Sequence, residues 1–180
     1  MGETAWKRNL VSIGAHRWNN CARSSTAEHG AYTSGVVGSN PTGRTDMIKV
    51  VGIDHLEISV SNFQRSRKFY GKLFKFLGFK ILFQFRGVVG WTNKITRYII
   101  KQALVKYRRH GYVKGMIGFH HYAFELSKKK DVDDLYRFLL ENKIKILDPP
   151  KFYYEYGGPY YAVFFADPDG LKLEGMHFGK

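Results

Sequence analysis

The chain contains one order of strand and helix patterns twice, and this duplication restricts its fold more than any other feature. An alternating run, IKVVGIDHLEISV, is followed by one helical pattern and three strand patterns, and GFHHYAFEL begins the same order again. Such agreement, at offsets of 65 and 66 residues, indicates two copies of one βαβββ unit. The matched positions are Gly52 with Gly118, His55 with His121, and FKIL at 79–82 with IKIL at 144–147. We therefore predict an α+β fold.

The predicted strands and helices also show which side chains share a face. In HLEISV, His55 and Glu57 alternate with apolar residues, so both point to the side opposite the apolar ones. Helical patterns follow in NFQRSRKFYGKLFKFLG and DVDDLYRFLLEN, where apolar residues recur three and four positions apart. Gly78 supplies a stop for the first helix.

Residues 1–46 are expected to be disordered. They are rich in small and polar residues without a strand or helix period, and they lack the apolar run of about 7 to 15 residues of a secretory signal. Glu3, Glu28 and Asp46 weigh against an organelle transit peptide. The run SGVVGSNPTGRT resembles a conceptual translation of the T-arm of a transfer-RNA gene. We therefore expect the genuine protein to begin at Met47 and residues 1–46 to be a mis-assigned extension.

Charge and composition narrow the possible partners. With 29 Lys and Arg against 15 Asp and Glu, the net charge is +14, and such a field attracts anions. The sequence contains no zinc finger, RRM signature or helix-turn-helix pattern, so we expect no nucleic-acid partner. No run approaches the roughly 18 apolar residues of a membrane span, so no membrane association is expected. The single cysteine, Cys21, excludes an internal disulfide and fits a reducing compartment, for which we predict the cytoplasm.

Three side chains form a candidate metal site. His55 and His121 occupy the same position in the two units, so pairing of the units' first strands would bring both imidazoles into one cavity. Glu174, in LKLEG, points to the face opposite Leu171 and Leu173. A buried carboxylate without a partner is costly, and two imidazoles with a metal ion remove that cost. The usual donors of catalytic zinc, manganese, nickel and non-haem iron are His with Asp or Glu.

IDHLEISV, HHYAFEL and above all FFADPDGLKLEGM resemble the vicinal-oxygen-chelate superfamily, which includes glyoxalases, bleomycin-resistance proteins, fosfomycin-modifying enzymes and extradiol dioxygenases. The resemblance covers about residues 48–178 and implies a glyoxalase-like fold of two modules, 47–114 and 115–180, forming a cupped mixed sheet. It also implies a divalent metal ion (zinc, nickel, manganese, cobalt or iron) on His55, His121 and Glu174.

The resemblance leaves the fourth ligand and the acid–base groups open. Glyoxalases of the superfamily take a fourth ligand from the last strand of the first module, where only Gln102 in ITRYIIKQA could serve; a solvent-facing Gln102 is the alternative. Glu174 could also move a proton, as ligand carboxylates do in glyoxalases. Glu57 is a candidate base or orienting group beside His55, and a solvated side chain is the alternative.

Aromatic residues give candidate walls for a substrate pocket. KFYYEYGGPYY places tyrosines around a Gly-Gly-Pro turn, among them Tyr156 and Tyr160, and Trp91 is a second candidate. Exposed loop tyrosines are the alternative. The expected ligand is a small anionic molecule.

We therefore predict a metal-dependent enzyme similar to glyoxalase-type lyases and isomerases, acting on a substrate with vicinal oxygens. A ligand-sequestering binder similar to bleomycin-resistance proteins is the first alternative, and a metal-dependent thiol transferase or dioxygenase is the second. Extradiol ring cleavage is disfavoured because Phe164 stands where those dioxygenases have Tyr. The chain is expected to be a monomer or a homodimer.

Overall fold

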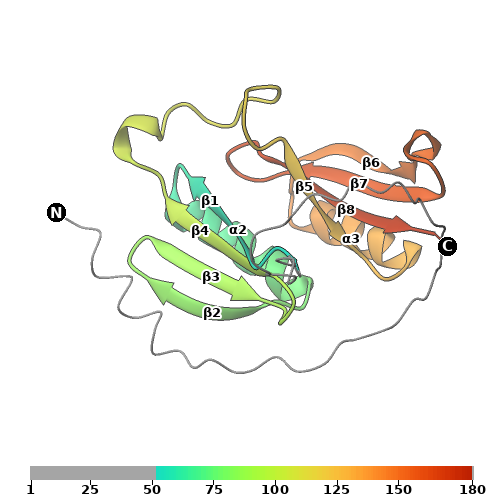
Figure 1. The fold of residues 1–180 in the computed structure, drawn as a ribbon, viewed down its shortest axis with the longest axis horizontal. Coiled ribbons are helices and arrows are strands. Elements are labelled where there is room, and N and C mark those ends of the chain that lie inside the picture. Colours follow the sequence, from blue (N-terminus) through green and yellow to red (C-terminus); the bar gives the residue numbers. More distant parts are fainter. Residues whose placement is uncertain (1–51, 180) are drawn as a thin grey trace, which may run out of the picture. The chain divides into compact units, whose positions relative to one another are not determined.

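The computed structural model describes residues 52–179 of the 180-residue chain. Two modules with the element order β-α-β-β-β follow each other along this part of the chain (Figure 1). The expectations for residues 1–46 and for a start at Met47 lie outside the described residues. The first module comprises β1 (His55–Val60), α2 (Phe63–Phe76), β2 (Lys80–Phe85), β3 (Val88–Thr92) and β4 (Arg97–Gln102). The second comprises β5 (His121–Glu125), α3 (Lys129–Glu141), β6 (Ile146–Phe152), β7 (Tyr160–Ala166) and β8 (Lys172–Phe178). Two 3-10 turns, η1 (Val105–Tyr107) and η2 (Tyr154–Tyr156), interrupt the loops.

Each module forms its own four-stranded mixed sheet with the same topology. The strand orders are β1-β4-β3-β2 and β5-β8-β7-β6. The first and last strands of a module pair in parallel, and the other pairs are antiparallel. The predicted α+β fold of two βαβββ modules is confirmed. Because β8 lies between β5 and β7, residues of these three strands meet on one face.

Helix α2 begins and ends where the sequence predicts. The side-chain oxygen of Asn62 accepts a hydrogen bond from the Arg65 N–H at 3.1 Å, which satisfies one of the free donors of the first turn. The chain leaves the helix at Gly78, whose φ of 80° is a left-handed conformation that glycine adopts without steric cost. Among the residues that the structure describes, no helix is long and apolar enough to cross a membrane.

The two modules share one apolar core. Leu73 of α2 and Leu135 of α3 are completely buried and belong to the same cluster. The rings of Tyr98 from β4 and Tyr122 from β5 lie 5.1 Å apart, so aromatic packing crosses between the modules. Burying an aliphatic or aromatic side chain of this size stabilises a fold by roughly 1.5–3 kcal/mol.

The DPDG turn before β8 joins the second module to the first through hydrogen bonds. The buried Asp167 carboxylate accepts one from the Tyr70 hydroxyl of α2 at 2.8 Å. Its other oxygen accepts from the backbone N–H groups of Asp169 and Leu171, both at 2.8 Å. Asp169 in turn accepts from the Ser61 N–H at 2.7 Å, at the end of β1. This turn therefore has a structural role in the described fold.

We expect Gly71→Ala to raise the free energy of unfolding by about 0.5–1 kcal/mol, because Gly71 lies inside α2, where glycine costs backbone entropy. A Cβ atom there would meet no atom within 4 Å. The matched control is Gly175→Ala in β8, whose Cβ would clash with the buried Leu135 side chain and should destabilise the fold. Urea unfolding of both variants tests this. A destabilised Gly71→Ala variant would contradict it.

Candidate functional site

The candidate site lies on one face of the second module's sheet, the face opposite α3. In the strand register, Ala123 of β5 and Phe164 of β7 are the neighbours of Glu174 on β8. His121 is two residues before Ala123, so its side chain shares this face with Glu174. The adjacent Gly175 points the other way, because a Cβ atom on it would meet Leu135 of α3. Alternation along β8 thus directs Glu174 away from the helix.

Glu174 is a buried carboxylate with two partners on this face. The residue is 2% exposed. One carboxylate oxygen accepts a hydrogen bond from the Tyr160 hydroxyl at 2.6 Å, and the other lies 3.2 Å from His121 Nε2. Burial of a carboxylate is tolerated when such partners are present. The structure therefore brings together Glu174, His121 and Tyr160, three of the residues singled out in the sequence.

His121 is in the form that ligates metals. Burial lowers the pKa of His121, the charge of Lys172 lowers it further, and Glu174 opposes the shift. The imidazole is thus neutral at physiological pH. Its second ring nitrogen, Nδ1, lies 2.6 Å from Nδ1 of His120. A second polar group at this position can fix the ring and its tautomer.

Aromatic side chains surround the Glu174 carboxylate. Tyr153, Phe164 and Met176 are buried in a small cluster, with Tyr160 packed against it. The Tyr156 ring is stacked on Tyr153 with centroids 5.8 Å apart, and its edge meets Tyr160 at 5.2 Å. Tyr156 itself is exposed. The predicted tyrosine wall therefore lies next to the carboxylate.

Lys172 places a positive charge on the same face. It is two residues before Glu174 on β8, and its Nζ lies 3.7 Å from the centre of the Phe164 ring. Burial lowers the pKa of Lys172, Glu174 opposes the shift, and the charge of Lys114 lowers it further. An anion bound beside Glu174 would meet this ammonium group.

His55 is not part of this group in the structure. Its side chain is 51% exposed, and its Nδ1 lies 2.9 Å from the carboxylate of Asp54, which also accepts a hydrogen bond from Arg97 at 3.3 Å. The imidazole is thus engaged with the rim of the first module's sheet.

Gln102 lies on the opposite face of its sheet from His55. It pairs in register with the buried Val60, whereas Ile99 pairs with Glu57. Its amide oxygen accepts from the Phe63 N–H at 3.1 Å, and its amide nitrogen donates to the Ser61 carbonyl at 2.8 Å and to the adjacent Val60 carbonyl. These bonds hold the turn between β1 and α2.

The strand register shows which residue of the first module is equivalent to Glu174. In the second module Glu174 pairs with the residue two positions after His121. In the first module, the residue two positions after His55 is Glu57, and Glu57 pairs with Ile99. An apolar side chain therefore occupies the position equivalent to Glu174.

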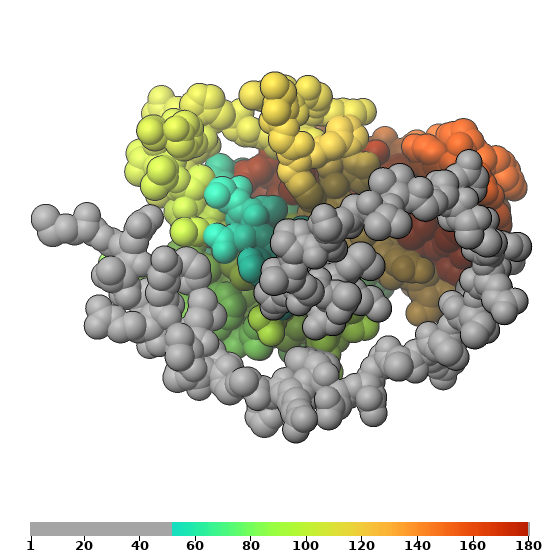
Figure 2. All heavy atoms as spheres, in the orientation of Figure 1, coloured from blue at the N-terminus to red at the C-terminus, as the bar shows by residue number. Residues whose placement is uncertain are grey.

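Glu57 and Trp91 line two other cavities. Glu57 borders a cavity of about 550 Å³ between β1 and the segment 103–120, which His110 also lines. Figure 2 shows the yellow-green and yellow spheres of that segment beside the cyan spheres of β1. Trp91 is buried under α2, on the helix-facing side of its sheet. The structure thus places neither residue with Glu174.

A family model of the Glyoxalase/Bleomycin resistance protein/Dioxygenase superfamily matches residues 52–174. The chain belongs to this superfamily. The protein YqjT of Bacillus subtilis (strain 168) is 30% identical over 120 residues, which are 67% of this chain and 94% of YqjT. A solved glyoxalase candidate from Bacillus halodurans is 27% identical, with a TM-score of 0.61 over 69% of this chain and 94% of its own. Lactoylglutathione lyase from Agrobacterium tumefaciens is 15% identical and shares the fold, with a TM-score of 0.53 over 71% of this chain and 94% of its own.

Superfamily membership implies a divalent metal ion, and two of the side chains present are suitable donors for one. A neutral imidazole and a buried carboxylate facing each other, as His121 and Glu174 do, are the donor types of zinc and non-haem iron sites. Within residues 52–179, no group of three His, Cys, Asp or Glu side chains lies close enough to hold an ion. His121 and Glu174 are therefore the two groups that would hold it here.

Two candidate residues of this superfamily site were missed in the sequence. His120 was not singled out, although the HH pair places it beside His121. Lys172 was not singled out, although strand alternation from Glu174 places it on the same face. Period-two spacing along LKLEG could have identified Lys172.

Proposed function

We propose that this chain is a divalent-metal-dependent lyase or isomerase that acts on a small anionic molecule with vicinal oxygens. The supporting observation is the buried Glu174 carboxylate, which faces the neutral His121 imidazole on an aromatic-lined sheet face. His121 and Glu174 would hold the ion, and His55 is the proposed third ligand. A bound divalent ion would supply Lewis-acid chemistry, which makes a proton next to a coordinated oxygen easier to remove.

The chain's own side chains have separate tasks in this proposal. Lys172 attracts and holds the anionic part of the substrate. Glu174 is the group that accepts the proton, and the Tyr160 hydroxyl holds its carboxylate in place through the 2.6 Å hydrogen bond. The aromatic rings of Tyr153 and Phe164 exclude water from the carboxylate. A cytoplasmic location and a monomeric or homodimeric state remain predictions.

A second candidate function is metal-free binding of a small anion on the same face. Two observations favour it: His55 is engaged with Asp54 on the sheet rim, and Ile99 occupies the position equivalent to Glu174. In this case Lys172 and the aromatic rings would bind the ligand without turnover.

Metal content distinguishes the two candidates. We expect the protein, incubated with each of zinc, nickel, manganese, cobalt and iron(II) and then desalted, to retain about one equivalent of one metal. His121→Ala should lower the retained metal at least about tenfold, because it removes a ligand. His177→Ala is the matched control, because His177 lies on β8 but alternates to the other face, where its ring contacts the Leu126 carbonyl. Equal metal contents in both variants would contradict the proposal.

His55→Ala tests the third ligand separately. If His55 is a metal ligand, the metal affinity of His55→Ala should be roughly 10- to 100-fold below that of the unaltered protein. Measurement by competition with a chromophoric chelator gives the affinity directly. Unchanged affinity would restrict the site to the His121–Glu174 pair.

A further inference from the structure

A second cavity lies along α2 and the adjoining edge of the sheet, in the first module. Its volume is about 740 Å³, within the range of roughly 300–1,000 Å³ that is usual for small-molecule sites. We call it the α2 cavity. Its principal lining residues are the basic Arg67, Lys68, Lys72 and Lys75 and the aromatic Phe79 and Trp91.

The basic residues of the α2 cavity lack carboxylate partners. Arg67 donates to the Gln84 amide oxygen at 2.9 Å, and Lys72 donates to the Asn142 amide oxygen at 3.1 Å, both of which are neutral. Within residues 52–179, none of the cavity's four cations lies within 4.0 Å of a carboxylate. Helix α2 contains no Asp or Glu. These cations therefore repel one another without internal compensation.

Some basic residues elsewhere in the fold do have carboxylate partners. Arg65, also in α2, forms a salt bridge with Asp169. In α3, Lys129 and Lys130 each pair with an Asp four residues further on, at 3.0 and 2.8 Å. Carboxylates thus neutralise these cations, whereas the four of the α2 cavity, which lie close together, have none in the part of the chain that the structure describes. An anionic ligand is the partner that the α2 cavity can accept.

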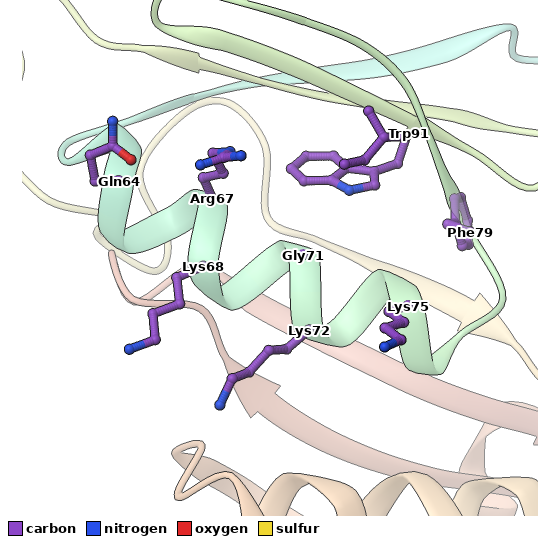
Figure 3. A pocket seen from close by; sticks show the side chains of 9 residues that line it. Gln64, Arg67, Lys68, Gly71, Lys72, Lys75, Phe79 and Trp91 are labelled. Atoms are coloured by element: carbon purple, nitrogen blue, oxygen red, sulfur yellow. The ribbon is translucent and has the colours of Figure 1, made fainter.

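Gly71 keeps the cavity open. It lies between Arg67 and Lys75 on the helix, and a Cβ atom there would meet nothing within 4 Å, so packing does not require glycine. Figure 3 shows Gly71 in the middle of the helix, with Arg67 and Trp91 on one side of it and Lys68 and Lys72 directed to the other. A larger side chain would project into this space.

The floor of the cavity is apolar. Phe79, Ile81 and Trp91 contribute to it, and Ile81 is 60% exposed. Trp91 pairs in register with Tyr98, on the helix side of the sheet, so the cavity is separate from the face that carries Glu57 and from the Glu174 site. Basic groups beside an apolar floor favour a ligand with one charged and one apolar part.

We propose that the α2 cavity binds a small organic phosphate, in which a phosphate or polyphosphate group is joined to an aromatic or other apolar group. The phosphate lies between the cationic side chains and the apolar group lies against Phe79 and Ile81. Charge-assisted hydrogen bonds from Lys and Arg to phosphate oxygens are among the stronger polar contacts in proteins.

Isothermal titration calorimetry on the full chain tests the ligand class. The probes are ATP, inorganic pyrophosphate and adenosine. We expect ATP to bind more tightly than either part alone, because the cavity offers contacts to both parts. Adenosine binding as tightly as ATP would overturn the phosphate assignment, and pyrophosphate binding as tightly as ATP would overturn the apolar contact.

Matched charge variants locate the site. Lys68→Glu with Lys72→Glu should weaken ATP binding at least about tenfold. Lys106→Glu with Arg109→Glu makes the same change in net charge on the segment 103–120, outside the cavity lining, and should change the affinity less than about twofold. Equal weakening in the two double variants would overturn the site, since it would show attraction by net charge alone.

Gly71→Met tests the cavity without altering its charge. The methionine side chain occupies the open space, and we expect ATP affinity to fall about fivefold while the protein stays folded by circular dichroism. Unchanged affinity would overturn the cavity assignment. A single-stranded DNA oligonucleotide is the last probe. If it binds more tightly than ATP and loses affinity in the same variants, the ligand is a nucleic acid and the proposal is overturned.

Discussion

Asp167→Ala is expected to lower the free energy of unfolding by about 3–5 kcal/mol, because it leaves three donors of the DPDG turn without an acceptor. The Tyr70 hydroxyl and the N–H groups of Asp169 and Leu171 all donate to this carboxylate. The hydroxyl is in the core, where water cannot replace the lost bond. Chemical denaturation of the variant and the unaltered protein under identical conditions measures the difference.

Asp167→Asn is the matched control for the loss of hydrogen bonds. The amide oxygen can still accept from the two N–H groups, and the amide nitrogen can donate to the Tyr70 hydroxyl. We therefore expect this variant to lose less than about half of the stability that Asp167→Ala loses. Equal losses would show that charge, rather than hydrogen bonding, accounts for the contribution of Asp167.

The same pair of proteins gives an expected pH dependence. Burial raises the pKa of Asp167 above its ordinary value of 3.8, although the Tyr70 hydroxyl and the Leu171 N–H oppose the rise. The folded state therefore binds a proton at a pH where the unfolded state has lost it. The stability that this proton contributes is complete below the unfolded pKa and is lost as the pH rises through the folded pKa. The stability of the unaltered protein relative to Asp167→Asn should fall as the pH rises above about 3.8. A relative stability that rises with pH would contradict the direction of the shift.

Local periodicity was sufficient to predict the elements of this fold. The alternation in HLEISV, the spacing of apolar residues in α2, and the stop at Gly78 all agree with the structure. Each of these features depends on residues a few positions apart. The repeated order then predicted the two modules, because a duplicated sequence folds into duplicated topology.

The position of Gln102 could not be obtained from the sequence in the same way. Strand alternation assigns a residue to a face only when the starting phase is known, and a shift of one residue reverses the face. The pairing of Gln102 with Val60, and of Ile99 with Glu57, is a property of the strand register. Only with that register does Ile99 emerge as the counterpart of Glu174.

The distance between His55 and the Glu174 group also could not be predicted from local patterns. Equivalent positions in two modules place two histidines on equivalent strands, but the separation of their rings depends on how the modules pack and on local partners such as Asp54. By contrast, His121, Tyr160 and Glu174 belong to one module, and same-face alternation on paired strands brings them together. The proximity of these three side chains therefore depends on the register of one sheet and not on how the modules pack.

Glu174→Gln is expected to lower metal affinity at least about 100-fold with little loss of stability. Glutamine has nearly the same shape, and its amide oxygen can still accept a hydrogen bond from the Tyr160 hydroxyl. The negative charge that a divalent ion requires is lost. Competition with a chelator measures the affinity, and thermal unfolding without added metal checks the fold.

Tyr160→Phe gives the graded comparison. It removes only the hydroxyl that orients the carboxylate, so metal affinity should fall by roughly tenfold, less than in Glu174→Gln. A larger effect in Tyr160→Phe than in Glu174→Gln would contradict the ligand role of the carboxylate. Wild-type metal affinity in Glu174→Gln would contradict it outright.

The anion affinity of Glu174→Gln distinguishes the two candidate functions, because it should fall for one and rise for the other. If a metal ion held by Glu174 binds the anionic substrate, loss of the ion removes the main positive charge and anion affinity falls. If the face binds its anion without metal, the substitution removes a buried negative charge close to Lys172, and anion affinity rises. Titration of one anionic ligand into both proteins, with and without a chelator, therefore decides between a metal-dependent enzyme and a metal-free binder.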